Sequence, residues 1–565
     1  MVPLWAKHYD PGVPLTVSPA DRSVPWLLVD AARNRPNTPA LVFFGKTTTY
    51  RSFREQVLRL SRALRELGVA KGDRVATLLP NSPQLAVTYH AVLNLGAVAV
   101  LMNPLFSPKE IAFQLQDSES SLLVALDHLM PKVEEVAREV SLREIIVTGL
   151  ADALPWPLSW IYPLKARWQG LPTGFTPGPG RRRYRDLLKA APLDEPPVPE
   201  PHDMALLQYT GGTTGTPKAA VLTHANLMAN VAQCNAWLPM VRYGAERMIG
   251  LIPYFHVFGL TVCLNWPLSQ AVSILVLPKF DIKVFLKALR KYRPTVLPGV
   301  PTLFVALINH PELPSIDFSE LWLCISGSAP LPQEVRDRFE ALTNCTIVEG
   351  YGLTEASPAT HFNPLRSARP PGSIGLPFPS TAAKIMDGET GERELPPGEV
   401  GELVIQGPQV MQEYWRRPED TVLTMRDGWL FTGDLAYMDE NGYFYIVDRK
   451  KDMIINSGFK VFPREVEEVL YQHPQVQEAV VFGVPDAYRG EVVKAVIVPR
   501  PGDRPLPEEI KEFLKPRLAE YKQPRYIEFR DELPKTFVGK VLRRVLREET
   551  MIQLQAASPA APPPP

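Results

Sequence analysis

Predicted helices alternate with short buried strands along most of the chain, and this alternation constrains the fold more than any other feature. The run YRSFREQVLRLSRALRELG, which begins at Tyr50, has apolar residues at helical spacing and ends at Gly68, a residue type that often terminates helices. A short apolar run of strand character, DRVATLLP, follows it. The same elements recur in the helical run FLKALRKY and the strand-like runs TVLPGV and LWLCIS. This alternation predicts an α/β fold with largely parallel sheets.

The chain is long enough for two or more domains, and its pattern changes after the turn-rich stretch MDENGYFYIVDRKKDMI. Beyond this stretch, the strand-like runs QEAVVFGVP and VVKAVIVP alternate with the helical runs PREVEEVLYQH and PEEIKEFLKPRLAEY. We therefore place a boundary near Asp448, between a large N-terminal domain of residues 1–447 and a smaller α+β domain that ends at Glu548. Residues 549–565, which end in a proline- and alanine-rich run, are expected to form a disordered tail.

The charge balance and the cysteines exclude several classes of partner and site. Lysine plus arginine and aspartate plus glutamate both number 61, so no overall field attracts nucleic acid, and we expect none to bind. The four cysteines lack metal-ligand spacing and the N-terminus lacks the pattern of a signal peptide, which favours a cytoplasmic protein. The most apolar long window, residues 259–278, is interrupted by polar residues and proline. It predicts a buried helix and a strand rather than a membrane span.

The stretch YTGGTTGTPKAAVLTH, from Tyr209 to His224, is typical of a loop that binds phosphate. A Walker-type loop needs serine or threonine after its lysine and a helix directly behind it. Here Ala219 follows Lys218, and the flanking runs MALLQYT and AAVL both have strand character. The pattern predicts a hairpin whose backbone amides and threonine hydroxyls enclose phosphate. Taken alone, it also fits a plain turn rich in glycine and threonine.

Five further motifs decide between these interpretations. In chain order they are GYGLTE (350–355), FTGD (431–434), DRKKDMI (448–454), SGFKVFPREVE (457–467) and PKTFVGKVLRR (534–544). With YTGGTTGTPK they resemble the motifs of the adenylate-forming enzymes, which comprise acyl-CoA synthetases, luciferases and peptide-synthetase adenylation domains. The resemblance runs from about Trp26 to Glu548 and departs at Ala219, where the family usually has glycine. It implies a large α/β domain with a smaller mobile domain, and a reaction in which ATP converts a carboxylate into an acyl-adenylate that a thiol then attacks.

The resemblance implies a nucleotide site. The residues implied to contact the β- and γ-phosphates of ATP are Thr210, Gly211, Gly212, Thr213, Thr214, Gly215 and Lys218. Thr210 and Glu355 are implied to hold Mg²⁺, and both are implied to act in catalysis with Lys218. The residues implied to surround the adenine and ribose are Gly327, Ser328, Ala329, Glu349, Gly350, Tyr351, Gly352, Thr354, Asp434 and Arg449. Tyr351 offers a flat face to the base, and the glycines beside it favour close approach of a ligand.

The C-terminal motifs imply that one mobile domain serves two half-reactions. Lys540 is implied to be the catalytic cation that enters the site for adenylation. Lys451 falls at the hinge position of the family, within residues 448–452. The domain of residues 453–548 would rotate there and present Gly458, Phe459 and Lys460 to coenzyme A.

The resemblance also implies a substrate pocket bordered by His256, Phe258 and Leu260. The surrounding run YFHVFGLTVCLNW has no acidic residue to bind a substrate amine, and its apolar side chains favour a fatty acid of medium or long chain. Some long-chain enzymes carry an aromatic gate at the position of Leu260, so that gate is not carried over. We predict ATP-dependent ligation of a fatty acid to coenzyme A. The alternatives are an aryl-acid CoA ligase of the hydroxycinnamate type, an acyl-AMP ligase that loads a carrier protein, and a nucleotide-binding regulator without activity.

The run LPWPLSWIYPLKARWQG, residues 154–170, combines three tryptophans with Lys165 and Arg167. Aromatic and basic residues on one short segment suit a membrane interface, so we expect weak peripheral contact with the inner face of a membrane. An ordinary surface loop packed by its own tryptophans is the alternative. The sequence leaves the oligomeric state open, with a homodimer among the options.

Overall fold

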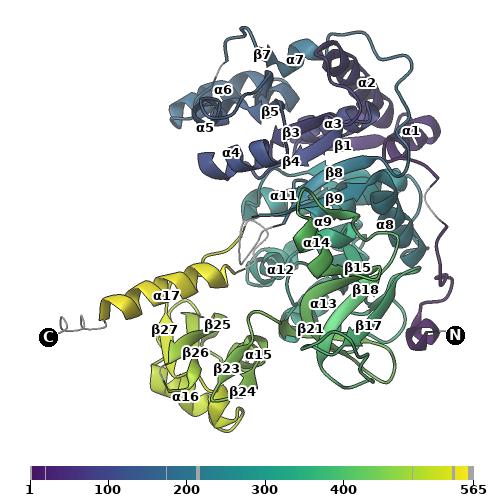
Figure 1. The fold of residues 1–565 in the computed structure, drawn as a ribbon. Coiled ribbons are helices and arrows are strands. Elements are labelled where there is room, and N and C mark those ends of the chain that lie inside the picture. Colours follow the sequence, from purple (N-terminus) through teal and green to yellow (C-terminus); the bar gives the residue numbers. More distant parts are fainter. Residues whose placement is uncertain are drawn as a thin grey trace.

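A computed structural model describes residues 3–18, 21–173, 175–210, 217–486, 488–536 and 541–557 of the chain. Helices and strands alternate through a large N-terminal part, and a smaller lobe follows it at the C-terminal end (Figure 1). The predicted α/β class is therefore confirmed.

The first large sheet has the strand order β19-β9-β8-β4-β3-β5-β6-β7. Its strands from β8 to β7 run parallel, whereas β9 and β19 add to its other edge in antiparallel fashion. The strands are β3 (Arg74–Leu78), β4 (Val98–Leu101), β5 (Leu122–Leu126), β6 (Glu144–Thr148), β7 (Arg181–Arg183), β8 (Met204–Tyr209), β9 (Ala219–Thr223) and β19 (Glu413–Tyr414). The helices between them are α2 (Tyr50–Glu66), α3 (Pro83–Asn94), α4 (Pro108–Asp117), α5 (Met130–Val136), α6 (Leu158–Trp168) and α7 (Tyr184–Leu187).

The second large sheet has the order β16-β15-β14-β13-β12-β10-β11-β1-β2, parallel from β14 to β1 and antiparallel at both ends. Its strands are β1 (Pro39–Phe43), β2 (Lys46–Thr49), β10 (Arg247–Gly250), β11 (Ser273–Val276), β12 (Val296–Gly299), β13 (Leu323–Ser326), β14 (Thr346–Gly352), β15 (Ala359–Phe362) and β16 (Leu376–Pro377). The associated helices are α1 (Pro25–Asn34), α8 (His224–Trp237), α9 (Val257–Leu260), α10 (Trp266–Ser269), α11 (Ile282–Tyr292), α12 (Pro301–Ile308) and α13 (Gln333–Thr343).

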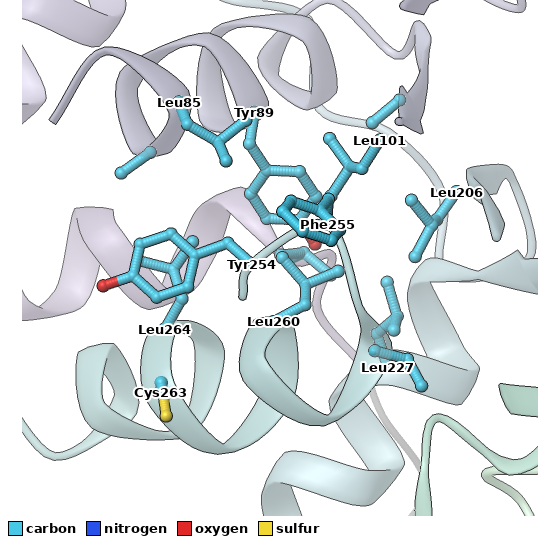
Figure 2. Close-up of a cluster of buried hydrophobic side chains, with 14 of the residues drawn as sticks. Leu85, Tyr89, Leu101, Leu206, Leu227, Tyr254, Phe255, Leu260, Cys263 and Leu264 are labelled. Carbon is cyan, nitrogen blue, oxygen red and sulfur yellow. The ribbon is translucent and has the colours of Figure 1, made fainter. Parts of the chain in front are cut away.

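One continuous apolar core joins the two large sheets. Every residue of α3 is buried, as expected for a helix enclosed on all sides. Figure 2 shows part of this core, where Tyr89 of α3 lies close to Phe255 and Leu260. The side-chain amide of Asn265 donates a hydrogen bond to the Tyr89 hydroxyl at 3.2 Å, which gives this buried hydroxyl a partner.

A third sheet and the C-terminal lobe complete the fold. The third sheet contains β17 (Ala382–Met386), β18 (Gly401–Gln406), β20 (Met425–Arg426), β21 (Trp429–Met438) and β22 (Phe444–Arg449), with α14 (Pro418–Thr424) beside it. The C-terminal lobe contains β23 (Ile454–Asn456), β24 (Phe459–Val461), β25 (Val476–Asp486), β26 (Gly490–Pro499), β27 (Tyr526–Phe529), α15 (Pro463–Tyr471), α16 (Pro507–Leu514) and α17 (Arg543–Ala557). This lobe has apolar clusters of its own on both faces of its sheet.

Local sequence rules account for α2. The side chain of Thr49 caps its first turn by accepting the N–H of Ser52, and its buried residues recur at helical spacing. Gly68 follows with φ +81°, a left-handed conformation that favours glycine. The predicted helix and its terminator are therefore confirmed.

The structure differs from the predictions at the C-terminus. The predicted tail begins at residue 549, but α17 continues to Ala557, so that start is wrong by nine residues. Residues 549–557 contain neither glycine nor proline, and Thr550 is buried, where its hydroxyl accepts a hydrogen bond from Lys494. Residues 558–565 lie outside the described part of the chain.

The tryptophan-rich run of residues 154–170 also differs from one of its two interpretations. It contains the helix α6. Its tryptophans do not pack it as a loop, because Trp156, Trp160 and Trp168 are 84%, 72% and 90% exposed. Leu164 of the same helix is also exposed. Within the described ranges, the helices are all too short or too polar to span a bilayer.

Candidate functional site

Two paired strands flank the glycine- and threonine-rich stretch. Strands β8 and β9 pair in antiparallel register, with Tyr209 opposite Ala219, and the Thr210 N–H donates to the Lys218 carbonyl at 2.8 Å. Helix α8 starts only at His224, after the strand. The predicted hairpin is confirmed, and a Walker-type arrangement is excluded because a strand follows the lysine. The predicted phosphate residues Gly211, Gly212, Thr213, Thr214 and Gly215 lie outside the described residues.

Lys218 and Glu355 meet around the ring of Tyr414. The Lys218 ammonium pairs with Asp420 and lies 5.4 Å from the centroid of the Tyr414 ring. On its other side, the Tyr414 hydroxyl donates a hydrogen bond to Glu355 Oε1 at 2.6 Å. Glu355 stands on the 3₁₀ turn Thr354–Ala356, and its carbonyl accepts the N–H of Met411. The structure thus brings together two predicted residues that are 137 positions apart in the sequence.

Sequence reasoning missed Tyr414 and Asp420. Both lie in the run QEYWRRPED, which has no periodicity or motif that points to phosphate. Burial, followed by the neighbouring Glu355 carboxylate, raises the pKa of Tyr414, so its hydroxyl remains a donor at neutral pH. The one local signal was the position of this run between two predicted nucleotide motifs.

A second cluster joins the second and third sheets. The Tyr351 hydroxyl, at the end of β14, donates to Asp434 Oδ2 at 2.6 Å, and Arg449 Nε lies 3.1 Å from Asp434 Oδ1. Asp434 and Arg449 are cross-strand partners on β21 and β22, so the sheet register itself places the pair. Burial, reinforced by Asp434, raises the pKa of Tyr351 well above its ordinary value, and Asp434 raises the pKa of Arg449.

The glycines beside Tyr351 have a structural explanation. A Cβ on Gly350 would lie 2.6 Å from the Phe362 ring, and one on Gly352 would lie 2.2 Å from the Pro358 carbonyl. Their small size is therefore required by packing within the protein, and close approach of a ligand to them stays a prediction.

The predicted base-lining loop is fixed from two directions. Ser328 has φ +71°, and a Cβ on Gly327 would lie 3.1 Å from the ring of Phe258. Ala329 follows in the same loop, and the N–H of Leu331 donates to the carboxyl group of Glu349 at 2.6 Å. Burial raises the pKa of Glu349 to about 7, although this hydrogen bond lowers it. Glu349 therefore contacts the loop itself, and Thr354 starts the turn that carries Glu355.

The predicted substrate residues begin the helical segment after Pro253. His256 caps α9, and its Nδ1 accepts the N–H of Phe258 at 3.2 Å. Phe258 is buried next to Gly327, whereas Leu260 is fully buried in the core of Figure 2. A π-helical turn, Thr261–Asn265, lies within the buried helical segment that the sequence predicted here. Irregular turns of this type are frequent at functional sites.

The boundary region connects β22 to the C-terminal lobe. Lys451 follows β22, and burial together with the nearby Arg449 lowers its pKa. Gly458 turns between β23 and β24 with φ +85°, while Phe459 stacks on Tyr521 at 4.7 Å between ring centroids. Lys460 reaches back to the third sheet, with Nζ 3.3 Å from Glu389 Oε1.

Lys540 itself lies outside the described residues, but the helix after it is anchored at this boundary. Arg543, in the first turn of α17, pairs with Glu467 at 2.7 Å and with Asp448 and Asp452 at 3.4 and 3.3 Å. These ion pairs link the C-terminal helix to the end of β22.

Comparison with known proteins decides the family. Residues 28–415 match the model of the AMP-binding enzyme family, and residues 465–540 match the AMP-binding enzyme C-terminal domain. The chain belongs to the AMP-binding enzyme family. Among curated AMP-binding enzymes, it is 45% identical to a long-chain-fatty-acid–CoA ligase of Bacillus subtilis (strain 168), over 96% of this chain and 98% of that protein.

The chain is also similar to two other proteins. A feruloyl-CoA synthase of an Amycolatopsis species is 37% identical over 92% of this chain and 97% of its own length. Among solved structures, ATP-bound MatB from Rhodopseudomonas palustris is similar with a TM-score of 0.82 and 31% identity, over 93% of this chain and 99% of MatB. The large and small parts of the fold therefore both belong to this family of enzymes.

Proposed function

We propose that this AMP-binding enzyme ligates a long-chain fatty acid to coenzyme A, with ATP cleaved to AMP and pyrophosphate. The observation that carries this proposal is the 45% identity, over 96% of the chain, to the long-chain-fatty-acid–CoA ligase. In the first half-reaction, a carboxylate oxygen attacks the α-phosphorus of ATP and pyrophosphate leaves. In the second, the thiol sulfur of coenzyme A attacks the acyl carbon, the thiol proton is lost, and AMP leaves.

The hairpin and its neighbours are proposed to bind the phosphates. Thr210, residues 211–215 and Lys218 would provide backbone N–H groups, hydroxyls and one cation to the β- and γ-phosphates. The position of Lys218 supports the binding of phosphate, because the lysine lies at the exit of the hairpin. Its ammonium group already pairs with an anionic group, the Asp420 carboxylate. Hydrogen-bond donors and a cation aimed at the triphosphate are what phosphoryl chemistry needs.

The residues present fit a magnesium ion. Glu355 uses Oε1 to accept the Tyr414 hydroxyl, so its other oxygen remains for a ligand role, and Thr210 offers a hydroxyl. Magnesium keeps several waters and commonly takes only one or two carboxylates besides substrate phosphates. Across the described ranges, no group of three or more His, Cys, Asp or Glu side chains is arranged to hold a metal ion. When bound, the ion would neutralise charge on the leaving pyrophosphate.

The second cluster is proposed to bind the nucleoside. Asp434 would accept the ribose hydroxyls, Arg449 would contact ribose or phosphate, and Tyr351 would stack on adenine. The loop of Gly327, Ser328 and Ala329 would line the other side of the base. Glu349, Gly350, Gly352 and Thr354 would complete the nucleotide site beside Tyr351.

The small domain is proposed to serve both half-reactions. Residues 1–447 and 453–548 would form the two domains, with a hinge at residues 448–452 around Lys451. Lys540 would reach the carboxylate and α-phosphate during adenylation. After rotation, Gly458, Phe459 and Lys460 would face coenzyme A.

The acyl chain is proposed to lie near His256, Phe258 and Leu260. These side chains border an apolar core, and the adenylation step needs no general base because a carboxylate is already ionised at neutral pH. An aryl acid is the second candidate substrate, because the feruloyl-CoA synthase is 37% identical to this protein over 92% of the chain.

Substrate profiling separates these candidates. The purified chain is assayed for CoA-dependent AMP release with acetate, octanoate, palmitate and coumarate. We expect the highest kcat/KM with palmitate, and a value at least about tenfold lower with coumarate. An apolar pocket discriminates between substrates by about 1–3 kcal/mol for each methylene group that is missing. Highest activity with coumarate would establish the aryl-acid ligase. AMP release that required a carrier protein rather than coenzyme A would establish the loading enzyme.

We further propose weak peripheral membrane contact through α6 in a cytoplasmic protein. Trp156, Trp160 and Trp168 are exposed beside Lys165 and Arg167, a composition that favours the interface of anionic lipids. Flotation with vesicles of phosphatidylglycerol tests this, with a Trp156→Ser/Trp160→Ser/Trp168→Ser variant as control. Flotation of the parent chain with the variant left in the soluble fraction is expected; no flotation of the parent would refute it. A homodimer is proposed as well, and sedimentation velocity at two protein concentrations tests it.

A further inference from the structure

A short segment outside the predicted motifs organises the phosphate site. We call residues 411–424 the strap. Its strand β19 pairs with β9, so that Tyr414 lies opposite Ala220, and the N–H of Trp415 extends the ladder to the Ala219 carbonyl at 2.8 Å. The strap therefore adds an edge strand to the hairpin that carries Lys218.

The strap is also fixed to the other stem of the hairpin. Arg417 Nη2 lies 2.8 Å from Asp117 Oδ1, and the hydroxyl of Tyr209, at the end of β8, donates to Asp117 Oδ2 at 2.8 Å. The Trp415 indole donates to the Asp117 carbonyl at 2.9 Å. Asp117 thus ties the strap to β8, while β9 ties it to the exit of the same hairpin.

Asp420 is held in place by this framework. It lies in the first turn of α14, two residues after Pro418, and the next residue, Thr421, uses its hydroxyl oxygen to accept the N–H of Tyr414 at 3.0 Å. The Thr421 hydroxyl donates to the Arg417 carbonyl at 2.8 Å. The carboxylate is therefore attached to a braced backbone, whereas its partner Lys218 extends on a flexible four-carbon stem.

The Asp420 carboxylate competes directly with phosphate. Among the described residues, Lys218 is the one cation that forms an ion pair with this carboxylate, and both side chains are about one-third exposed. A polyphosphate that takes the Lys218 ammonium must break this pair, and it would then lie near a carboxylate of like charge. The broken ion pair and the repulsion between like charges both weaken binding of the polyphosphate. Neither acts after the polyphosphate has left.

We propose that Asp420 is the resting counter-ion of Lys218, a positioning residue that the lysine leaves for the phosphates of ATP and rejoins when pyrophosphate departs. This inference rests on the proposed role of Lys218. Asp420 would limit the affinity for pyrophosphate, so that the product of the first half-reaction leaves instead of reversing it. Tyr414, whose ring faces the ammonium, would remain beside Lys218 in both states.

Calorimetric titration of the full chain with magnesium pyrophosphate, and separately with MgATP, without fatty acid, tests the proposal. Asp420→Asn keeps the shape of the side chain and removes its charge. We expect both ligands to bind about two- to fivefold tighter to this variant, the range for a partly exposed ion pair. The gain should shrink as salt is raised, because exposed charges are screened.

Three variants make the result decisive. Glu419→Gln removes the same charge from the neighbouring position of α14, and it should leave both affinities within about twofold of the parent. Asp420→Glu keeps the charge and should resemble the parent chain, which also controls for folding. Lys218→Ala should weaken pyrophosphate binding.

The outcomes separate the inference from the proposed function. Unchanged or weaker binding by Asp420→Asn, with a loss in Lys218→Ala, would overturn the counter-ion role and leave the phosphate role of Lys218 intact. Unchanged binding by Lys218→Ala would overturn the phosphate role and the inference with it. Equal tightening by Glu419→Gln and Asp420→Asn would show a general charge effect and would also overturn the inference.

Discussion

The hydroxyl group of Tyr351 donates a hydrogen bond to Asp434 Oδ2 at 2.6 Å, across the junction between the second and third sheets. The other oxygen of this carboxylate faces Arg449. One buried aspartate is therefore oriented by a phenol from one sheet and a guanidinium from its own. If Asp434 binds ribose as proposed, this arrangement would fix the carboxylate in advance and so reduce the ordering that binding requires.

Tyr351→Phe should weaken ATP binding without loss of the aromatic face. Hydrogen bonds to charged groups contribute about 1.5–3 kcal/mol, so we expect the Kd for MgATP to rise about tenfold or more. Titration calorimetry measures it. Tyr437→Phe, on the same strand as Asp434, is the control and should bind like the parent chain. An unchanged Kd in Tyr351→Phe would show that Asp434 needs no orientation by the phenol.

Tyr414→Phe should raise the magnesium requirement. The substitution keeps the ring beside Lys218 and removes only the donor to Glu355, so the carboxylate loses its orientation. We expect the free Mg²⁺ concentration for half-maximal AMP release to rise about threefold or more, the effect of losing roughly 1 kcal/mol of hydrogen bonding. Tyr445→Phe, whose hydroxyl donates to Asp439, serves as control. A purely structural role for Tyr414 would lower the thermal stability and leave the Mg²⁺ dependence as it is.

Glu349→Gln should change how stability depends on pH. Burial raises the pKa of Glu349 from 4.5 to about 7, so between these values the folded chain holds a proton that the unfolded chain has lost. Because only the folded chain holds this proton, the free energy of unfolding of the parent falls by roughly 3 kcal/mol as pH rises from about 4.5 to 7, and it stays level above that range. The neutral glutamine removes this loss. Thermal unfolding at pH 5 and pH 8 should show the variant gaining on the parent only at pH 8. A constant difference in Tm would contradict the shifted pKa.

Lys540→Ala should separate the two half-reactions. If Lys540 acts only in the adenylation conformation, the variant loses formation of acyl-AMP by about 10²-fold or more, the usual effect of removing one transition-state donor. Thioester formation from supplied acyl-AMP and coenzyme A should stay close to the parent rate. Both rates are measured by rapid quench and mass spectrometry. Equal loss of both would argue against rotation of the small domain.

Much of the fold followed from patterns local in the sequence. The spacing of apolar residues in α2 and the glycine after it predicted a helix and its end, and the strand character of AAVL after Lys218 predicted a hairpin. These features depend on neighbours within a few positions, where the rules of helix and strand formation apply. The irregular π-helical turn Thr261–Asn265 was not predicted, because nothing in its composition distinguishes it from a regular turn.

The candidate site was only partly predictable. Its motifs were recognised, but the contacts of Tyr414 and Asp420 with Glu355 and Lys218 join segments up to 202 residues apart. Such contacts depend on how the strap pairs with β9, which no short pattern encodes. The packing at the two glycines beside Tyr351 was not predictable for a related reason, since Phe362 and Pro358 approach them only in the folded sheet.

A two-stage reaction tests the proposed chemistry most directly. The purified chain is mixed with MgATP and palmitate without coenzyme A, and coenzyme A is then added, with products followed by mass spectrometry. We expect palmitoyl-AMP and pyrophosphate in the first stage, and conversion of palmitoyl-AMP into palmitoyl-CoA and AMP in the second. Formation of ADP and phosphate, or an adenylate that forms from coumarate and not from palmitate, would contradict a fatty-acid–CoA ligase that acts through an acyl-adenylate.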